Sequence, residues 1–437
     1  MCKNVMISVI TYVKNGMPYI RECIESLINQ DFPGLEIIIV DGGSVDNTLD
    51  FIRNIAKNDK RVVVLNSEAS VGRQFNKALS VARGEYIAIC ESDDYVLPDT
   101  YSKLWTIAEN TKCDVIRSDY EQFVGNNEKR KCFRTHAASK SDLYKKIIQN
   151  SSNILLDEGV NGFWSGLYKK SFLIDNEIFM SETPGASYQD VGFSFKCQCL
   201  AQTVYFHDEV FYQYRLDNPN ASMNVKNRVN KMISEFVQLE DWLKKKKIWE
   251  KYYVEYFKWE LTALKKAYIN IDDVNKKEIY ETTKIELKKQ FDINKLSEEY
   301  LEFVSEFDEY IEIQEKEKRK FLNYLDNIHS DKRKIVIFGA GFLGEVSSHI
   351  LTELYNVDYQ LVDNNKKLQG TIKNNHEIFS LDAVIEDGSD QVYFVSNVNY
   401  AADIKKQLIE AKINEDNIYI CNNDELLLRR ILLNSNR

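Results

Sequence analysis

Short apolar runs alternate with amphipathic stretches between residues 5 and 120 of the chain. The apolar runs have the length and composition of buried parallel strands, and they cover residues 5–10, 35–40, 61–65, 84–90 and 114–118. Between these runs, apolar residues recur at helical spacing, which predicts helices over residues 18–30, 46–55 and 72–82 and another after Pro98. Strand and helix units in this order predict an α/β domain with a mostly parallel sheet and helices on both faces.

The fourth apolar run ends abruptly in the acidic sequence Glu91, Ser92, Asp93 and Asp94. Side chains at the carboxyl ends of the strands of an open α/β sheet lie where such sheets bind ligands. Because like charges repel, Glu91 and Asp93 favour a cation beside them, and Mg²⁺ or Mn²⁺ on a diphosphate is the simplest candidate. The alternative is a loop of solvated acids in which Asp94 or Asp99 caps the next helix. The motif alone leaves both interpretations open.

Several motifs, in order along the chain, resemble those of family 2 glycosyltransferases with the GT-A nucleotide-diphospho-sugar fold. The motifs are an N-terminal strand with Thr11 and Asn15, then LEIIIVDGGSVDNT, VGRQFNKALSVARGEYI, ESDD and PGASYQDVGFSFKCQCLA. The resemblance covers residues 5–224, and several motifs in the right order are more specific than any one of them.

The resemblance implies roles for particular side chains. It implies that Asp41 contacts the nucleobase, that Glu91 and Asp93 lie on the ribose and the metal, and that Asp190 is the catalytic base. Glu91 stands where the family usually has Asp, and its extra methylene can move the carboxylate by about an ångström. The expected donor site comprises Thr11, Asn15, Asp41, Gly72, Arg73, Glu91, Ser92, Trp164 and Arg215.

Two of these positions also have a case of their own in the local sequence. Asp41 follows a strand and precedes two glycines, so the backbone can approach a planar base whose N–H the carboxylate accepts. The alternative is that Asp41 only organises the turn. Gly72 and Arg73 begin a helix, where exposed N–H groups and a guanidinium suit phosphate, although a surface arginine is the competing interpretation.

Residues 121–192 are expected to form the acceptor side of the site. Glycines at 159, 162 and 166 punctuate this region, which also contains Trp164 and Tyr168. These rings suit stacking against a sugar or a peptide, but a tryptophan buried in the core fits the sequence equally well.

Asp190 lies where a helix begins, after the turn formed by Pro184 and Gly185. A carboxylate in the first turn of a helix is stabilised as the anion and held in place. Displacement of a diphosphate from an anomeric carbon requires a base within about 3 Å of the acceptor hydroxyl, and Asp190 suits this role. The alternative is helix capping without chemistry.

His207 and Arg215 follow in a strand pair and an extended segment. His207 is a candidate for completing the metal site, as a C-terminal histidine does in related enzymes, although a lone histidine is more often structural. Arg215 is a candidate for a bidentate clamp on the diphosphate.

Beyond Pro219 the chain changes character. There is no later proline, no glycine occurs between Gly192 and Gly339, and apolar residues recur at three and four. This pattern predicts a bundle of amphipathic helices over residues 225–332 that joins domains or forms a homodimer. Its aromatic stripe is expected in a core rather than on a membrane, because acids are interleaved with the lysines.

Residues 333–437 contain a third unit. A strand precedes Gly339, Gly341 and Gly344 in GxGxxG spacing, and Asp363 ends a second strand 22 residues after Gly341. A Rossmann-like domain is expected, and the region resembles accessory domains found beside bacterial glycosyltransferases. A regulatory nucleotide pocket and an empty scaffold both remain open, and bound NAD(P) is not expected.

Composition narrows the class of protein. A net charge of −10 and a pI near 5.3 argue against a nucleic-acid partner. The longest apolar runs fall short of the roughly 20 residues of a membrane span, and the start lacks signal-peptide features, so a cytoplasmic protein is expected. The 8 cysteines include no CxxC pair, which favours reduced thiols over disulfides or zinc.

Together these patterns predict three domains: GT-A over residues 1–224, helical over 225–332 and Rossmann-like over 333–437. The expected reaction is metal-dependent transfer with inversion, using Mn²⁺ or Mg²⁺ and a UDP-sugar such as UDP-GlcNAc. The expected acceptor is a hydroxyl on a cell-surface polysaccharide or on a surface protein, for example a Ser or Thr of flagellin. The alternatives are an NAD(P)-linked oxidoreductase acting through the C-terminal domain and a non-catalytic assembly protein that binds a sugar nucleotide.

Overall fold

The computed structural model consists of two compact units, Met1–Glu260 and Leu261–Arg437, which are described separately. It describes residues 5–125, 130–138, 140–149, 156, 162–186, 188–219, 228–269, 333–340, 344, 347–348, 351–352, 358–373, 376–385, 391–396 and 400–420. The first unit runs to Glu260, beyond the predicted boundary at 224. Most of the predicted helical region, residues 270–332, lies outside the described residues.

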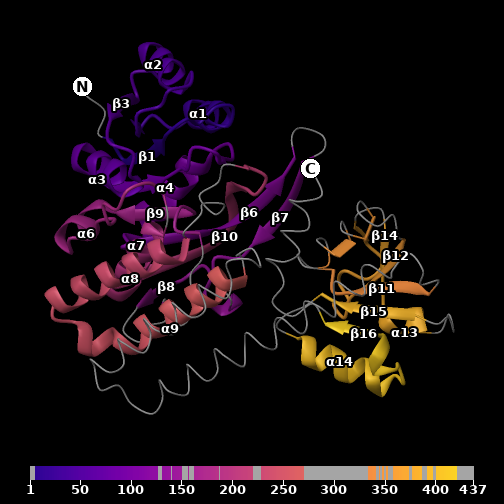
Figure 1. Ribbon diagram of the computed structural model, residues 1–437. Helices are drawn as coiled ribbons and strands as arrows, with labels where there is room; N and C mark the ends of the chain where they lie inside the picture. The colour runs from indigo at the N-terminus through magenta and orange to yellow at the C-terminus, as the bar shows by residue number, and fades with distance from the viewer. Residues whose placement is uncertain are drawn as a thin grey trace. The chain divides into compact units, whose positions relative to one another are not determined.

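A 10-stranded mixed sheet forms the centre of the first unit (Figure 1). Its parallel half consists of β3 (Val62–Asn66), β2 (Leu35–Asp41), β1 (Ile7–Val13) and β4 (Tyr86–Ile89), in that order. The sheet continues through β9 (Gly166–Lys169), β6 (Val115–Val124), β10 (Thr203–Arg215) and β5 (Tyr95–Val96). Two further strands lie off this path: β7 (Lys131–Thr135) pairs with β6, and β8 (Ile147–Gln149) pairs with β10.

The predicted strands and helices of the parallel half are present. The helices are α1 (Ile20–Ile28), α2 (Thr48–Asn58), α3 (Val71–Val81) and α4 (Thr100–Thr111). The later part of the sheet is more antiparallel than the pattern suggests, because β9 runs antiparallel to both β4 and β6. It is followed by α6 (Lys170–Asp175) and α7 (Gln189–Leu200), and a short 3-10 helix, η2, covers Ser141–Leu143.

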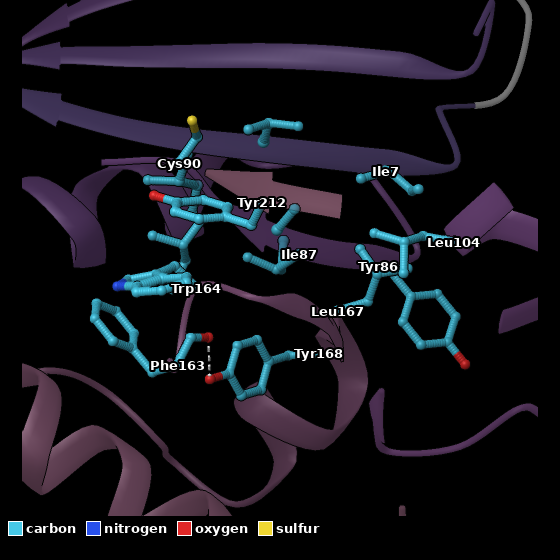
Figure 2. Packing of buried hydrophobic residues seen from close by; sticks show 14 of the residues in the cluster. Ile7, Tyr86, Ile87, Cys90, Leu104, Phe163, Trp164, Leu167, Tyr168 and Tyr212 are labelled. Atoms are coloured by element: carbon cyan, nitrogen blue, oxygen red, sulfur yellow. Dashed lines mark hydrogen bonds between the residues drawn. The ribbon is translucent and has the colours of Figure 1, made fainter. Parts of the chain in front are cut away.

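The core of this unit lies between the sheet and its helices. Strand residues of β1 and β4 meet side chains from α4 and β9, including Tyr86, Leu104 and Tyr168 (Figure 2). Each of these three side chains is at most 2% exposed. Because β1 pairs in parallel with both β2 and β4, the carboxyl ends of these three strands lie at one edge of the sheet.

Two long helices, α8 (Arg228–Lys245) and α9 (Trp249–Ile269), pack against α7. The hydroxyl of Tyr252 on α9 donates to the carbonyl of Cys199 at 2.7 Å, and the ring of Phe195 lies edge-on to that of Trp259 with centroids 5.2 Å apart. Tyr252 and Tyr256 are buried. The prediction that this aromatic stripe is core is confirmed for these residues, and no helix within the described ranges is long and apolar enough to cross a bilayer.

The second unit contains a 6-stranded sheet. Its order is β13 (Ile372–Lys373), β14 (His376–Phe379), β12 (Tyr359–Val362), β11 (Lys334–Phe338), β15 (Gln391–Val395) and β16 (Ile418–Ile420). All pairs are parallel except β13 with β14. The other elements are α13 (Leu381–Ile385), α14 (Ala401–Glu410) and η6 (Glu415–Asn417). The α/β prediction for this unit is confirmed.

The glycine motif of the second unit packs tightly where it is described. A Cβ on Gly344 would lie 1.8 Å from the carbonyl oxygen of Gly339, so a side chain there would displace backbone. Gly341 lies outside the described residues. Glycine at 344 is therefore explained by packing alone, whether or not a nucleotide binds.

A buried carboxylate on β6 ties the sheet to the segment after β7. Asp119 accepts hydrogen bonds from the Nδ1 of His136 at 2.7 Å and the hydroxyl of Tyr144 at 2.6 Å. Arg134 completes an ion pair at 2.8 Å. Burial opposes ionisation of Asp119, but these bonds outweigh it and lower its pKa, and the hydrogen bond to Asp119 raises the pKa of His136.

This pair predicts a pH dependence of stability. Because the folded-state pKa of His136 is raised, its contribution is complete below the usual value near 6.5 and is lost as pH rises through the raised pKa. The His136 side chain is 65% exposed, so the effect is expected to stay below about 1 kcal/mol. Denaturant midpoints at pH 6 and pH 8 are compared between the unaltered protein and His136→Gln. The substitution should change the difference by the contribution of His136 and leave the part due to Glu91 and Lys196, whose pKa values of about 8 lie in the same range. An unchanged difference in that variant would contradict this assignment.

Candidate active site

The carboxyl ends of β1 and β2 are joined by a buried glutamine on α3. The Gln74 amide donates to the carbonyl of Val13 at 3.0 Å and to that of Val40 at 2.7 Å. The N–H of Gly42 also donates to Val13, at 2.7 Å. These bonds hold the loop after β2 beside the loop after β1.

Asp41 ends β2 and is 1% exposed. Its Oδ2 accepts from the N–H groups of Gly43 at 2.9 Å and Ser44 at 3.0 Å, as expected of a residue that organises the turn. Its Oδ1 is buried and has no hydrogen-bond partner in the part of the chain that the structure describes. A buried acceptor without a donor is costly, so this oxygen suits the N–H of a ligand.

The two other donor-site candidates at this edge have different surroundings. Thr11 on β1 is fully buried, and its Oγ1 has no hydrogen-bond partner among the described residues. Asn15 is exposed and fastens two loops together, since its N–H donates to the hydroxyl of Ser44 and its Oδ1 accepts from the N–H of Val45, both at 2.8 Å. Asn15 therefore shapes the rim of the site.

The acidic motif after β4 is a cluster of interacting carboxylates. The Tyr12 hydroxyl donates to Oε1 of Glu91 at 3.0 Å. Burial, and then the charges of Asp93 and Asp190, raise the pKa of Glu91 to about 8. Asp93 accepts from the Asn218 amide at 2.7 Å. These acids repel one another when they are ionised, and a divalent metal would relieve this repulsion and favour the ionised form of Glu91.

Asp94, predicted only as a possible helix cap, joins the acidic motif to β10 through buried hydrogen bonds. It is 1% exposed, and its oxygens accept from the hydroxyl of Tyr212 and the N–H of Arg215, both at 2.7 Å. Asp99 precedes α4 and makes no side-chain capping bond. Burial, followed by the charges of Asp93 and Glu91, raises the pKa of Asp94. In the sequence, only the position of Asp94 in the acidic run indicated this role, because its partners lie more than 100 residues away along the chain.

Arg215 is placed behind the acidic motif. Its side chain is 2% exposed, its Nε donates to the carbonyl of Asp93 at 2.9 Å, and its guanidinium pairs with Glu22 and, at 3.3 Å, with Asp217. These donors serve protein groups, which favours a role for Arg215 in holding the acidic loop over the predicted diphosphate clamp.

The surroundings of His207 favour a structural role over the predicted metal ligand. On β10 it is paired with Ser118 of β6, whereas Arg215 is paired with Phe123, five residues further along. At about 3.3 Å per residue, this register separates His207 by about 17 Å along the strand from Arg215, whose Nε contacts the carbonyl of Asp93. The His207 ring instead stacks on Phe211, with centroids 5.5 Å apart.

Trp164 belongs to the core. It is 7% exposed and stacks on Tyr212 at a centroid distance of 4.1 Å (Figure 2). Its ring also stacks on that of Tyr214, at 5.0 Å. Tyr168 is fully buried, and its hydroxyl donates to the carbonyl of Phe163 at 2.7 Å. Of the two interpretations weighed for these rings, the geometry favours the core over an exposed stacking platform.

Gly72 and Arg73 are used within the protein. A Cβ on Gly72 would lie 1.7 Å from the carbonyl oxygen of Ser181, so glycine permits the start of α3 to touch that segment. Arg73 pairs with Glu68 and, at 3.6 Å, with Glu182. The interpretation of Arg73 as a surface arginine fits these contacts better than a phosphate ligand. Ser92 lies in the turn of the acidic motif.

Asp190 lies in the first turn of α7, as predicted. Its charge raises the pKa of Tyr12 and of Glu91, after burial as the main cause in both cases. The carboxylate is therefore within electrostatic reach of the acidic motif, although the two are about 100 residues apart in sequence. Tyr188, immediately before the helix, has a left-handed backbone with φ of 60°, which sets the direction from which the chain enters α7.

Two carboxylates are available to a metal at this edge. Among the residues that the structure describes, no group of three or more His, Cys, Asp or Glu side chains could hold a metal ion. Mg²⁺ and Mn²⁺ are commonly held by one or two carboxylates while phosphate and water supply the remaining ligands. Glu91 and Asp93 fit a site of this kind, with two carboxylates and ligands from phosphate and water.

A sheet of this topology, with carboxylates after β2 and β4 and a third at the start of α7, defines a GT-A glycosyltransferase domain. Residues 8–172 match the model of glycosyl transferase family 2. Residues 8–172 therefore carry a glycosyl transferase family 2 domain.

Individual relatives cover this same part of the chain. EpsH of Bacillus subtilis, described as a glycosyltransferase, is 31% identical over 215 residues, which make up 48% of this chain and 60% of EpsH. The poly(ribitol-phosphate) beta-glucosyltransferase of Bacillus spizizenii is 26% identical over 227 residues, or 50% of this chain and 33% of that protein. The chain thus spans less than two thirds of either relative.

A solved structure, TarS 1–349 of S. aureus in complex with UDP-GlcNAc, is 19% identical to the chain, with a TM-score of 0.45. The alignment covers 61% of this chain and 82% of that one.

Proposed function

We propose that the chain is an inverting, metal-dependent glycosyltransferase that moves a sugar from a nucleotide diphosphate to an acceptor hydroxyl. The observation that carries the proposal is the electrostatic proximity of Glu91, Asp93 and Asp190, which come from two distant segments. Family membership of residues 8–172 supports the same reaction class.

The expected donor is a UDP-sugar such as UDP-GlcNAc. The unpartnered Oδ1 of Asp41 is an acceptor, and uracil presents a ring N–H at neutral pH. Guanine also has a ring N–H, whereas cytosine and adenine present only exocyclic amines. The carboxylate therefore favours uracil or guanine, and the two are distinguished by the experiment below.

In the proposed reaction the acceptor oxygen attacks the anomeric carbon on the face opposite the diphosphate. Asp190 takes the hydroxyl proton as the new C–O bond forms and the bond to the diphosphate oxygen breaks, which inverts the anomeric configuration. Glu91 and Asp93 would hold Mn²⁺ or Mg²⁺, which when bound stabilises the charge that develops on the departing diphosphate. Asp94 and Arg215 keep the acidic loop in place from behind.

The proposed acceptor is a hydroxyl of a cell-surface polysaccharide, or a Ser or Thr of a surface protein such as flagellin. The relative named as a poly(ribitol-phosphate) beta-glucosyltransferase supports the polymer. Nothing comparable favours the protein acceptor, so the polymer is the first substrate class to assay.

One contact in the second unit bears on the oxidoreductase alternative. Both oxygens of Asp363 accept backbone N–H groups, from Ala340 and from Asn365, each at 2.7 Å. In a dinucleotide site this acid would bind the ribose hydroxyls. Here both carboxylate oxygens accept backbone N–H groups instead, one of them from Ala340 in the glycine motif. This favours a scaffold role for the second unit over dinucleotide binding.

The donor assignment is tested by thermal shift with UDP, GDP and CDP in the presence of Mn²⁺. We expect UDP to raise the melting temperature more than CDP, because cytosine has no ring N–H for Oδ1 of Asp41. If the donor is a UDP-sugar, UDP should also exceed GDP. An asparagine at 41 cannot accept at both atoms, so Asp41→Asn should weaken UDP binding by at least about tenfold. Asp50→Asn, an exposed carboxylate on α2, is the matched control. A larger shift with GDP would exclude UDP, and an unchanged response in Asp41→Asn would remove Asp41 from the base site.

A further inference from the structure

A carboxylate on α8 is buried against the segment that leads into α7. Glu235 is 4% exposed, and it accepts hydrogen bonds from the hydroxyls of Ser181 and Thr183. It lies outside residues 8–172, which match the family model, in the region where the sequence predicts a helical bundle that joins domains or forms a homodimer. A buried carboxylate is costly unless its hydrogen bonds are satisfied, so this arrangement constrains both partners.

The contacts continue from Thr183 to the residue beside Asp190. The side chain of Gln189 is buried, and its Nε2 donates to the hydroxyl of Thr183 at 3.0 Å and to the carbonyl of Gly185 at 3.1 Å. Gln189 is the first residue of α7, and Asp190 is the second. A continuous set of hydrogen bonds therefore joins α8 to the start of the helix that carries Asp190.

The opposite side of the same segment is fastened to α3. Gly185 accepts from the N–H of Val71 at 3.0 Å and donates to the carbonyl of Ala69 at 2.8 Å. The Asn76 amide donates to the carbonyl of Met180 at 2.9 Å. Residues 180–185 are thus held from both sides, and Glu235 supplies the hydrogen-bond acceptor on the α8 side.

A charge on α7 complements this arrangement. The ammonium of Lys196 donates to the carbonyl of Phe179 at 2.9 Å and lies 5.4 Å from the ring centroid of Trp242 on α8. Burial lowers the pKa of Lys196 to about 8, and the nearby charge of Glu235 opposes that change. Glu235 is thus linked to the start of α7 through Thr183 and Gln189, and it lies within electrostatic reach of Lys196 in the middle of α7.

We propose that Glu235 is a positioning residue for Asp190, and that α8 is a working part of the transferase rather than a linker. The proposal rests on the proposed function, in which Asp190 accepts the acceptor's proton. Glu235 holds the hydroxyls of residues 181 and 183, these orient Gln189, and Gln189 sets where α7 begins. Loss of the carboxylate leaves two hydroxyls without their acceptor and frees the start of α7 to shift.

The test compares Glu235→Ala and Glu235→Gln with Thr183→Val, which removes the next group in the series. Glu250→Ala, an exposed glutamate at the start of α9, is the matched control. The assay measures UDP release from UDP-GlcNAc with Mn²⁺ and water as acceptor, the dissociation constant of UDP, and hydrogen exchange of peptides covering residues 181–190. Asp190→Asn is assayed in parallel.

We expect kcat of Glu235→Ala and Thr183→Val to fall by about 10- to 100-fold, because a displacement of about 1 Å at a reacting group has effects of this size. Affinity for UDP should change less than about twofold, since the proposed sites for the nucleobase and the diphosphate do not include residues 181–190. Exchange over residues 181–190 should rise. Glu235→Gln retains one acceptor oxygen and should keep much of the rate. A variant that combines Glu235→Ala with Thr183→Val should be little slower than either single variant.

The outcomes separate the two proposals. If Asp190→Asn is inactive while Glu235→Ala keeps full kcat and unchanged exchange, the positioning role is wrong and the transferase proposal stands. If Asp190→Asn keeps full activity, the proposed base is wrong, and any effect at Glu235 does not act through it. A lower melting temperature in Glu235→Ala with normal kcat for the folded protein would show a structural role only and would overturn the inference.

Discussion

Replacement of Asp190 by asparagine lowers the rate of sugar transfer by about 10²- to 10⁴-fold and leaves donor binding intact, if the proposed mechanism holds. Asparagine has nearly the same shape as aspartate but cannot take the hydroxyl proton. Asp190 lies in the first turn of α7, within electrostatic reach of Glu91, so the substitution also removes negative charge from the acidic cluster. Donor binding should consequently stay equal or improve slightly. Steady-state rates and calorimetric titration with UDP measure the two effects separately.

Asp175→Asn is the matched control for that experiment. Asp175 ends α6, is exposed, and lies in the same part of the first unit. Its substitution should leave both rate and affinity unchanged. Full transfer activity in Asp190→Asn would exclude Asp190 as the base, and a parallel loss of donor affinity would indicate a binding role instead.

Removal of divalent metal should abolish transfer, and Asp93→Asn should lower it by at least about 100-fold, since a metal supplies several kcal/mol of transition-state stabilisation. Asp93 accepts from Asn218 through one oxygen, which leaves the other for a ligand. Treatment with EDTA followed by graded addition of Mn²⁺ or Mg²⁺ measures the requirement. In Asp93→Asn a higher concentration of metal should be needed for half-maximal activity.

Asp99→Asn provides the control for the metal experiment. Asp99 has a left-handed backbone, which asparagine tolerates, and its side chain makes no capping bond. Its activity and metal requirement should match those of the unaltered protein. Transfer that persists in EDTA, or an Asp93→Asn variant with an ordinary metal requirement, would refute the metal role given to Asp93.

Much of the first sheet was predictable from local pattern. Apolar runs such as Leu35–Asp41 and Tyr86–Ile89 became buried strands, and the acids that follow them lie at the carboxyl edge. A window of about ten residues is enough to predict a strand and the polar loop that follows it. Buried strands need apolar side chains, and ligand sites need polar ones.

The roles of single polar residues were less predictable. The sequence could not distinguish an arginine that clamps phosphate from one like Arg215, whose guanidinium serves Glu22 and Asp217. It could not separate an exposed stacking platform from Trp164, which is buried against two tyrosines. His207 carried no signal of its distance from the acidic motif, since strand register and not residue type sets that distance.

Residue pattern alone determined the order of strands and helices, the edge at which the acids gather and the family that the N-terminal domain resembles. Tertiary structure alone decided which polar groups remain available and which hold others in place. Arg215 pairs with Glu22, 193 residues away in the sequence. Asp94 accepts from the N–H of Arg215, 121 residues away, and Ser181 donates to Glu235, 54 residues away. Hydrogen bonds and ion pairs act over a few ångströms of space, so partners this far apart along the chain become visible only once it is folded.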